Sequence, residues 1–401
     1  MNYTTSELAL NLPNVPFLMD LTQLYEQFCQ LSDQRCRRGV RYPLAKVLLL
    51  ALLGKLAGHN KFEQIADWTA AHRVELGQWL DLIRPTTPHA CTFSRVLGEG
   101  LICEQLEQLV SQHFQAQLAS QIPQRGSLTL SIDGKTLRGT IKTGNTQGVH
   151  LMAAYLPKQG VVLAQVAVGT KTNEITAAPR LLSSLDLRGI VVSGDAMQAQ
   201  KGLSVQIVAA GGDYLWLVKA NQKGLLGEIS QLFEPLEWGA GFGPVALEFA
   251  SFVEYSTGHG RVEKRTITVS SELAGYSYWP HLAQVFKLER EWLELATDQV
   301  KSEVRYGITS LPSLVAKPAR LLEIAREEWA IENGLHWRRD NTFEEDARQV
   351  RRGEAPQVSA VLDNIVLSLL GLAGKANVAK ARRQWGFSFS RALWQWAAYQ
   401  A

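Results

Sequence analysis

The chain has 401 residues, of which 46% are hydrophobic and 20% are charged, a composition that excludes a chain disordered throughout its length. The chain has 41 lysine and arginine residues and 38 aspartate and glutamate residues, which gives a net charge of +3. This charge is weak evidence for a polyanionic partner, so such a partner has to be judged from local clusters of charge. The length exceeds what one hydrophobic core usually holds and predicts two or three domains.

We expect neither a membrane span nor a secretory signal. The longest apolar run near the N-terminus, 47–54, has 8 residues, whereas a bilayer span needs about 20. The first ten residues lack a basic stretch followed by an apolar one. The cysteines form no C-x-x-C pair, so we expect buried thiols in a reducing cytosol and no zinc site; they are Cys29, Cys36, Cys91 and Cys103.

Residues 1–122 predict a helical domain, because apolar residues recur there at three- and four-residue spacing. A basic loop lies between its first two helices, with one acid, Asp33, among five bases. Such a loop fits either a phosphate-binding segment or a solvated turn. Its bases are Arg35, Arg37, Arg38, Arg41 and Lys46.

Residues 123–221 change to short runs rich in β-branched residues. Three strands in close succession predict an antiparallel meander, and a helix, a strand, a second helix and a last strand follow. This order is that of a ribonuclease-H-like α/β fold, although other α/β domains share it.

Residues 222–312 alternate and contain a T-G-H-G turn, which predicts a β-rich insertion. Residues 313–374 read as helices again. The tail, 375–401, contains five bases and no acid, interleaved with aromatic residues. That mixture suits either a nucleic-acid arm or a segment that docks on its own protein.

Two aspartates follow apolar strands, Asp133 in IDGK and Asp195 in GDAM. Carboxylates at the carboxyl ends of strands stand where α/β sheets usually bind ligands. Each alone is typical of a turn or cap residue. Together they resemble half of a Mg²⁺ site, because Mg²⁺ takes a few carboxylates, water and phosphate.

A third acid is expected on the helix AREEWAIENGLHWRRD. A regular helix would place Trp329, Glu332, His336 and Arg339 on one face, with an acid and bases directed toward one substrate. The alternative is an exposed, ion-paired helix.

Several motifs, taken together and in order, resemble the ISAs-type DDE transposases of bacterial insertion sequences, also called H-repeat-associated proteins. They are IDGKTLRGT, KTNEITAAPRLL, GDAMQAQKGL, GGDYLWLVKANQ, HGRVEKR and REEWAIENGLHWRRDNTFEEDA, preceded by DQRCRRGVRYPLAKVLLLALLGKLAG. The resemblance spans roughly residues 20 to 370. It implies a ribonuclease-H-like catalytic core with a β-rich insertion, preceded by an all-α domain that binds DNA.

The resemblance implies that Asp133, Asp195 and Glu332 are the catalytic, metal-binding acids. They lie 62 and 137 residues apart, which leaves room for the insertion. It implies two Mg²⁺ ions, replaceable by Mn²⁺, that promote in-line displacement at phosphorus. Candidate DNA contacts near these motifs are Lys135, Arg138, His336, Arg339, His259 and Arg261, together with Arg35, Arg37, Arg38 and Arg41 of the basic loop.

The sequence departs from the family pattern in two places, which comprise three residues. Glu328 stands where the family usually has His, and we expect a tolerated departure and not a further metal ligand. Arg338 and Arg339 replace apolar residues, and Arg339 falls where related transposases carry Lys.

The implied function is cleavage of element ends and their joining to target DNA, by a cytoplasmic, nucleoid-associated protein that forms a homodimer on double-stranded DNA. The alternatives are a DNA-binding relative with impaired catalysis and a metal-dependent nuclease without strand transfer.

Overall fold

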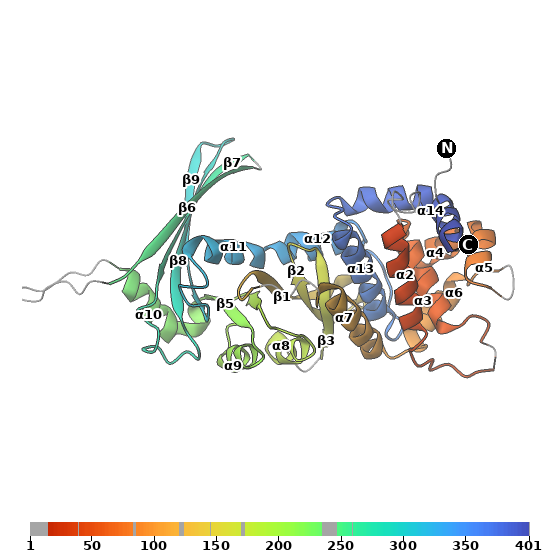
Figure 1. Cartoon of the computed structure of the whole chain (residues 1–401), viewed down its shortest axis with the longest axis horizontal. Helices are drawn as coiled ribbons and strands as arrows, with labels where there is room; N and C mark the ends of the chain where they lie inside the picture. The colour runs from red at the N-terminus through yellow and green to blue at the C-terminus, as the bar shows by residue number, and fades with distance from the viewer. Residues whose placement is uncertain are drawn as a thin grey trace, which may run out of the picture. The chain divides into compact units, whose positions relative to one another are not determined.

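The computed structural model describes residues 15–38, 40–82, 86–119, 124–144, 146–169, 173–234, 247–258 and 260–400 (Figure 1). Its internal contacts divide the chain into two compact units. The first unit consists of residues 1–118, 134–172 and 332–401, and the second of 119–133 and 173–331. The limits of these two units differ from the boundaries of the five segments expected from the sequence, and the five segments stay a prediction.

The first unit is mainly helical. Its N-terminal part is α-helical, as expected, and comprises α2 (Val15–Phe28), α3 (Leu44–Leu56), α4 (Phe62–Ala71), α5 (Arg73–Trp79), α6 (Ala90–Glu99) and α7 (Cys103–Ala119). Helix α6 lies within the stretch expected to be helical and buries Phe93, Val96 and Leu97. Strands β2 (Val149–Leu156) and β3 (Val161–Val168) form an antiparallel hairpin in the same unit.

Helix α13 (Ala355–Leu372) is the core helix of this unit and packs on α3, α6 and β3. Among the described residues it is the one helix long and apolar enough to cross a bilayer, and 83% of that apolar segment is buried inside the protein. Such burial is what a core helix requires, because an all-round apolar surface must be covered.

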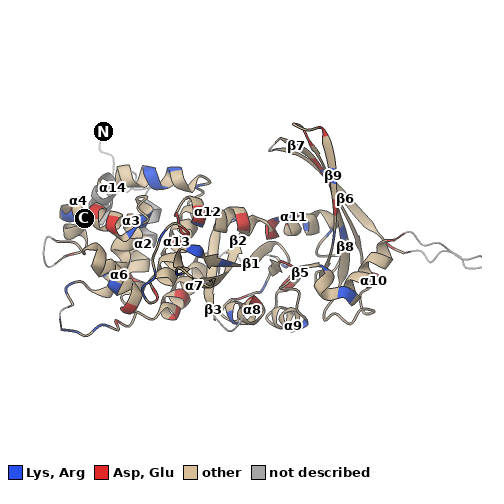
Figure 2. Cartoon of the chain, turned by 180° about the vertical axis from the view of Figure 1, so that it is seen from behind, with Lys and Arg blue, Asp and Glu red and all other residues tan. Residues whose placement is uncertain are grey.

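Helix α14 (Val378–Gln400) contains most of the basic, aromatic tail (Figure 2). The Arg382 guanidinium donates hydrogen bonds of 2.7 Å to the carbonyls of Lys55 and Thr342. Trp385 and Phe389 are buried. The first half of the tail therefore docks on its own protein, which is one of the two expected alternatives.

The second unit is built around a sheet. Its strands are β4 (Ile190–Gly194), β5 (Asp213–Val218), β6 (Ala250–Gly258), β7 (Arg261–Ser270), β8 (Gln284–Glu294), β9 (Gln299–Thr309) and the first part of β1 (Leu128–Leu137). The strand order is β3-β2-β1-β4-β5-β9-β8-β7-β6, with β1 shared between the units. Strands β1, β4 and β5 are parallel, and β9 pairs antiparallel with β5.

Helices cover both faces of this sheet. On one face lies α11 (Pro318–Glu328), whose Leu321 and Ile324 form a core with Leu215 and Leu217 of β5. On the other, the Trp216 indole donates a 2.9 Å hydrogen bond to Ser204 of α9 (Lys201–Ala209). Helices α8 (Glu174–Leu182) and α10 (Lys223–Phe233) complete the unit.

The expected mixed α/β class with helices at the N-terminus is confirmed. The strands of the expected insertion extend the sheet through β5 and β9, and α10 adds a helix that the alternating pattern did not predict. The expectation of buried thiols is wrong for three cysteines: only Cys103 is buried, because Cys29, Cys36 and Cys91 lie on helix ends and a loop that face solvent.

Candidate active site

Two carboxylates lie at matched positions on neighbouring parallel strands. The last residue pair between β1 and β4 is Ile132 with Gly194, and Asp133 and Asp195 follow directly. Because parallel strands end at the same edge of a sheet, both carboxylates lie at that edge. Strand β1 itself continues to Leu137, so Asp133 follows the end of the pairing with β4 but lies within the strand and not after it, contrary to expectation.

The Asp195 carboxylate also shapes the loop after β4. Its Oδ1 accepts hydrogen bonds from the backbone N–H of Met197 at 2.9 Å and Gln198 at 3.3 Å. The Asn221 amide closes the loop from the β5 side with a 2.6 Å bond to the carbonyl of Ala196. Asp195 is thus both a turn residue and a strand-end carboxylate, and the turn fixes where the carboxylate lies.

Burial raises the pKa of Asp195, and the negative charges of Asp133 and Glu174 raise it further, whereas the two backbone hydrogen bonds lower it. Glu174 is the first residue of α8 and accepts a 3.1 Å hydrogen bond from the Gln198 amide. The acidic residues here repel one another, which is typical of a site that binds a cation.

Helix α11 lies along β1 and carries a further acid to this edge. At its start, the Arg320 guanidinium donates 3.0 Å hydrogen bonds to the carbonyl of Ser127 and the hydroxyl of Thr129. At its end, the Ser131 hydroxyl donates a 2.9 Å bond to the carbonyl of Glu327. Side chains alternate along a strand, so Asp133 shares the face of Ser131 on which α11 lies.

Glu328, the last residue of α11, acts electrostatically on both aspartates. Burial is the main cause that raises its pKa to about 7; Asp133 and Asp195 raise it further, while Arg305 and Lys219 act in the opposite sense. Its Oε2 atom is buried without a hydrogen-bond partner among the described residues. Glu328 therefore belongs to the acidic cluster. It was not expected there from the sequence.

The helix after α11 is irregular where a regular one was expected. Glu332–His336 form a π-helical segment, followed by α12 (Trp337–Asn341). Trp329 is 52% exposed and Glu332 is exposed, whereas His336 and Arg339 are buried. The expected shared face is therefore wrong, because a π turn inserts a residue into the 3.6-residue repeat. The metal-binding role of Glu332 stays a prediction from the resemblance.

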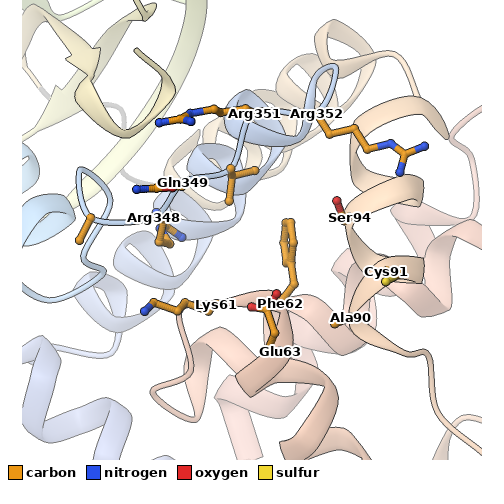
Figure 3. Close-up of a pocket in the computed structure, with 12 residues that line it drawn as sticks. Lys61, Phe62, Glu63, Ala90, Cys91, Ser94, Arg348, Gln349, Arg351 and Arg352 are labelled. Atoms are coloured by element: carbon orange, nitrogen blue, oxygen red, sulfur yellow. The ribbon is translucent and has the colours of Figure 1, made fainter. Parts of the chain in front are cut away.

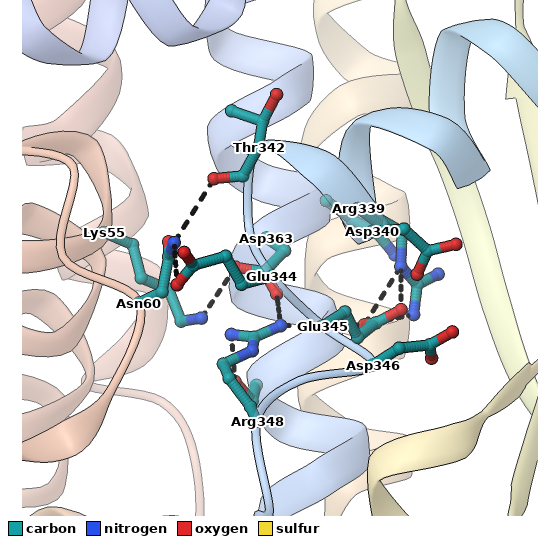
Figure 4. A network of polar contacts seen from close by, with 12 residues as sticks. Lys55, Asn60, Arg339, Asp340, Thr342, Glu344, Glu345, Asp346, Arg348 and Asp363 are labelled. Carbon is teal, nitrogen blue, oxygen red and sulfur yellow. Dashed lines mark hydrogen bonds and ion pairs between the residues drawn. The ribbon is translucent and has the colours of Figure 1, made fainter.

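Lys135 is bound by three acids, Asp340, Glu345 and Asp346, which Figure 4 shows as part of a larger polar network. Its Nζ lies 2.6 Å from Asp340, 3.3 Å from Asp346 and 3.8 Å from Glu345. Arg138 is largely exposed, and its backbone N–H donates a 3.0 Å bond to Asp346. Of these two candidates for phosphate binding, only the Arg138 side chain is open to solvent.

Arg339 is fully buried and forms a bidentate ion pair with Glu345 at 2.7–3.1 Å. The network continues through Arg348, which pairs with Asp363, and Asp363 also binds Lys55 of α3 at 2.6 Å. Burial lowers the pKa of Lys55 to about 7, since desolvation disfavours its charge. These charges join α3, α13 and the segment after α12, so Arg339 lies in a buried ion-pair network, and its expected contact with DNA stays a prediction.

Only some of the basic side chains in the loop between α2 and α3 are open to solvent. Arg37, Arg38 and Arg41 are exposed, whereas Arg35 is tied to Asp33 at 2.6 Å. Arg261 begins β7 and is half-buried. His259 lies outside the described residues.

A polar pocket of about 720 Å³ lies in the first unit between α4, α6 and residues 347–352 (Figure 3). Its arginines already have partners: Arg348 pairs with Asp363, Arg352 with Glu99, and Arg351 donates to the carbonyl of Gly139. This pocket therefore offers few free cations for an anionic ligand.

Three residues at the strand edge escaped the sequence analysis: Glu174, Lys219 and Arg305. Lys219 directly follows an apolar strand, so the strand-end rule applied to the two aspartates would have found it. Arg305 reaches the site through the pairing of β5 with β9, which the sequence does not reveal.

Residues 124–369 match the model of the transposase DDE domain, and residues 25–114 match the DDE_Tnp_1-associated model. The first match covers more than half of the chain, and the chain therefore belongs to the DDE transposase family.

Individual relatives are consistent with this class. The "H repeat-associated putative transposase YhhI" of Escherichia coli is 29% identical over 88% of the chain and 91% of its own length. An uncharacterised protein of Xanthobacter autotrophicus is 34% identical over 70% of the chain and 91% of its own length. A solved piggyBac transposase synaptic complex with hairpin DNA aligns with a TM-score of 0.44 at 10% identity, which is too distant to bear on the fold.

Proposed function

We propose that the chain is the transposase of a bacterial insertion sequence. It binds the inverted repeats at the ends of its element, cuts the DNA there and joins the ends to target DNA. Membership of the DDE transposase family supports a DNA-cutting and DNA-joining enzyme. We also infer that β1–β5 form a ribonuclease-H-like core, because the meander, the two parallel strands and their helices follow that order.

One observation carries the proposal: Asp133 and Asp195 lie side by side on β1 and β4, with Glu328 over the same face. The charge of Asp133 raises the pKa of both Asp195 and Glu328, and carboxylates gathered in this way are unfavourable without a cation. The orphaned, buried Oε2 of Glu328 fits that need. Mg²⁺ fits these residues, because it takes a few carboxylates and keeps water and substrate phosphate as its remaining ligands.

Asp133 and Asp195 would hold two Mg²⁺ ions, with Mn²⁺ as a substitute, and Glu332 supplies the third carboxylate by its place in the family motif. When bound, such ions activate a water or 3′-hydroxyl and offset the charge on the leaving oxygen. The carboxylates of the chain orient the ions and form no covalent bond to DNA. The Asp195 turn and the Ser131–Glu327 bond keep the carboxylates in place before DNA arrives.

The remaining assignments follow from the same proposal. The helical block 1–122 binds DNA, aided by exposed Arg37, Arg38 and Arg41. A homodimer brings the two element ends together, and the protein acts in the cytoplasm on nucleoid DNA.

The test uses a supercoiled plasmid that carries the inverted repeats flanking the gene, incubated with the full chain and Mg²⁺. We expect cuts at the repeats and joined products with target DNA. Cuts without joined products identify a nuclease, and binding without cuts identifies a non-catalytic relative; either result contradicts the proposal.

A further inference from the structure

Two cations lie beside the acidic cluster at the same edge of the sheet. Strand β5 pairs with β9 through Val218 and Tyr306, and the next position along both strands holds Lys219 and Arg305. Lys219 keeps an extended backbone, with φ of −129° and ψ of −172°, so it continues the direction of β5. The two side chains therefore start from adjacent points of the sheet.

The face on which these cations lie follows from strand alternation. Leu217 of β5 packs on the side of α11, so Lys219, two residues further, is directed to that side as well. Arg305 shows the same orientation directly, because its guanidinium lies 5.0 Å from the ring centre of Trp329, which follows α11. Both cations thus share a face with Asp133, Asp195 and Glu328.

Arg305 is held in one position. Glu303 accepts two hydrogen bonds from its guanidinium, at 2.7 Å and 3.0 Å, and the Trp329 ring lies beside it. Lys219 is exposed. Glu303 uses two of the five N–H donors of Arg305, so the others stay available to an anion, and Lys219 adds a movable ammonium beside them.

A pocket of about 340 Å³ opens at this edge of the sheet, where Lys219, Glu303 and Arg305 line it together with Val304 and Tyr306, which alternate to the opposite face, and with Leu226 of α10. Its size lies within the usual range for small-molecule sites, about 300–1,000 Å³. The cations also have an electrostatic task, since a DNA strand that approaches several carboxylates is repelled unless positive charge offsets them. Lys135 and Arg339, which were expected to provide that charge, are buried in the network of the first unit.

We propose that Lys219 and Arg305 form a phosphate-binding pair that holds a phosphodiester of the DNA strand next to the catalytic carboxylates. The inference rests on the proposed function and deepens it. It assigns the role expected of Lys135 and Arg339 to residues from β5 and β9. The same pair also gives β9, part of the expected insertion, a direct part in substrate binding.

The test measures binding of the full chain to a fluorescein-labelled 30-base-pair duplex in EDTA across a series of salt concentrations. Each phosphate contact contributes about −0.9 to the slope of log affinity against log salt. We expect Lys219→Gln to make the slope less steep by about that amount and to weaken binding roughly 3–10-fold near 0.1 M salt. Lys219→Arg, which keeps the charge, should restore the wild-type slope.

Lys264→Gln is the matched control, because Lys264 is a partly exposed cation of β7 on the opposite face and pairs with Glu291. Arg305→Gln provides a second variant, with thermal unfolding measured alongside. Should the Lys219→Gln slope equal that of the wild type, or should Lys264→Gln change it equally, the phosphate-binding pair is overturned. The two failures can be told apart. If only the phosphate-binding pair is wrong, the wild-type protein still cleaves the plasmid; if the proposed function is wrong, the wild-type protein does not cleave it.

Discussion

At the scale of single residues, Glu328 has the most unexpected environment. It replaces the family's usual His, and its charge interacts with Asp133 and Asp195. A buried carboxylate beside two others strengthens the negative potential that attracts a divalent cation. The sequence alone favours a tolerated departure at this position, whereas the charges around Glu328 lead us to predict that it contributes to metal affinity.

Glu328→Gln should therefore raise the Mg²⁺ concentration needed for half-maximal cleavage roughly 3–10-fold at pH 8, which corresponds to about 1 kcal/mol. At that pH the carboxylate, whose pKa is about 7, is mostly ionised.

Glu332→Gln should abolish cleavage with Mg²⁺ and Mn²⁺ alike while DNA binding persists. The two roles are exchanged if Glu332→Gln cuts normally and Glu328→Gln does not cut.

Arg339 gives a second prediction at this scale. Arg339→Ala leaves Glu345 buried and without its bidentate partner, and the loss of one member of a buried ion pair costs about 3–5 kcal/mol. We expect that loss in the free energy of unfolding measured with urea. Arg338→Ala is the control and should cost about 1 kcal/mol or less, since Arg338 is only half-buried. A fully stable Arg339→Ala protein with weak cleavage would restore the phosphate role expected from the sequence.

The sequence predicts those parts of the candidate site whose location depends only on a residue and the strand next to it. Asp133 and Asp195 follow apolar strands, and the parallel pairing of β1 with β4 brings them together. The ion pairs of Lys135 and Arg339 with Glu345 were not predictable, because a basic residue near a motif has the same sequence pattern whether it faces DNA or a carboxylate of its own chain. Only long-range packing separates these cases.

At the scale of elements, the helix around Glu332 shows the limit of periodicity. A 3.6-residue repeat predicts faces only while the helix is regular, and the π-helical segment Glu332–His336 breaks that repeat. Helix α10 escaped prediction because it lies within a stretch dominated by alternating strands. In contrast, β1 to β5 follow the predicted order, since each carries its own apolar pattern and turn signals.

Helix α7 supplies a prediction for the pH dependence of stability. His113 is buried there, and burial lowers its pKa to about 4. The unfolded chain then binds more protons than the folded one between pH 4 and about 6.5, so stability is lost as the pH falls through that window.

Between pH 7 and pH 5 this histidine should account for about 1–2 kcal/mol of lost stability. Urea unfolding at both pH values measures the loss, and His113→Gln should show correspondingly less of it. An equal loss in the wild type and the variant would assign the acid sensitivity to other groups.

At the scale of the whole molecule, the strands expected as a separate insertion belong to the same sheet as the catalytic strands. The pairing of β5 with β9 places residues 299–309 next to residues 213–218, although about 80 residues separate them in the chain. The mixed α/β class could be read from local patterns, whereas this junction depends on which edge β9 joins. No local pattern specifies that choice.

The central claim is that carboxylates at the ends of the β1–β4 pairing carry the chemistry, and charge removal at one of them tests it most directly. Mg²⁺-dependent nicking of plasmid DNA is measured for Asp133→Asn, with Asp186→Asn as the control. Asp186 is a partly exposed carboxylate paired with Arg188 before β4, toward the amino end of that strand.

Asp133→Asn should fold and bind DNA as the wild type does, because the change preserves shape, yet it should not nick. Asp186→Asn should nick normally. More than a few per cent of wild-type nicking by a folded Asp133→Asn protein would contradict the account and remove Asp133 from the metal site.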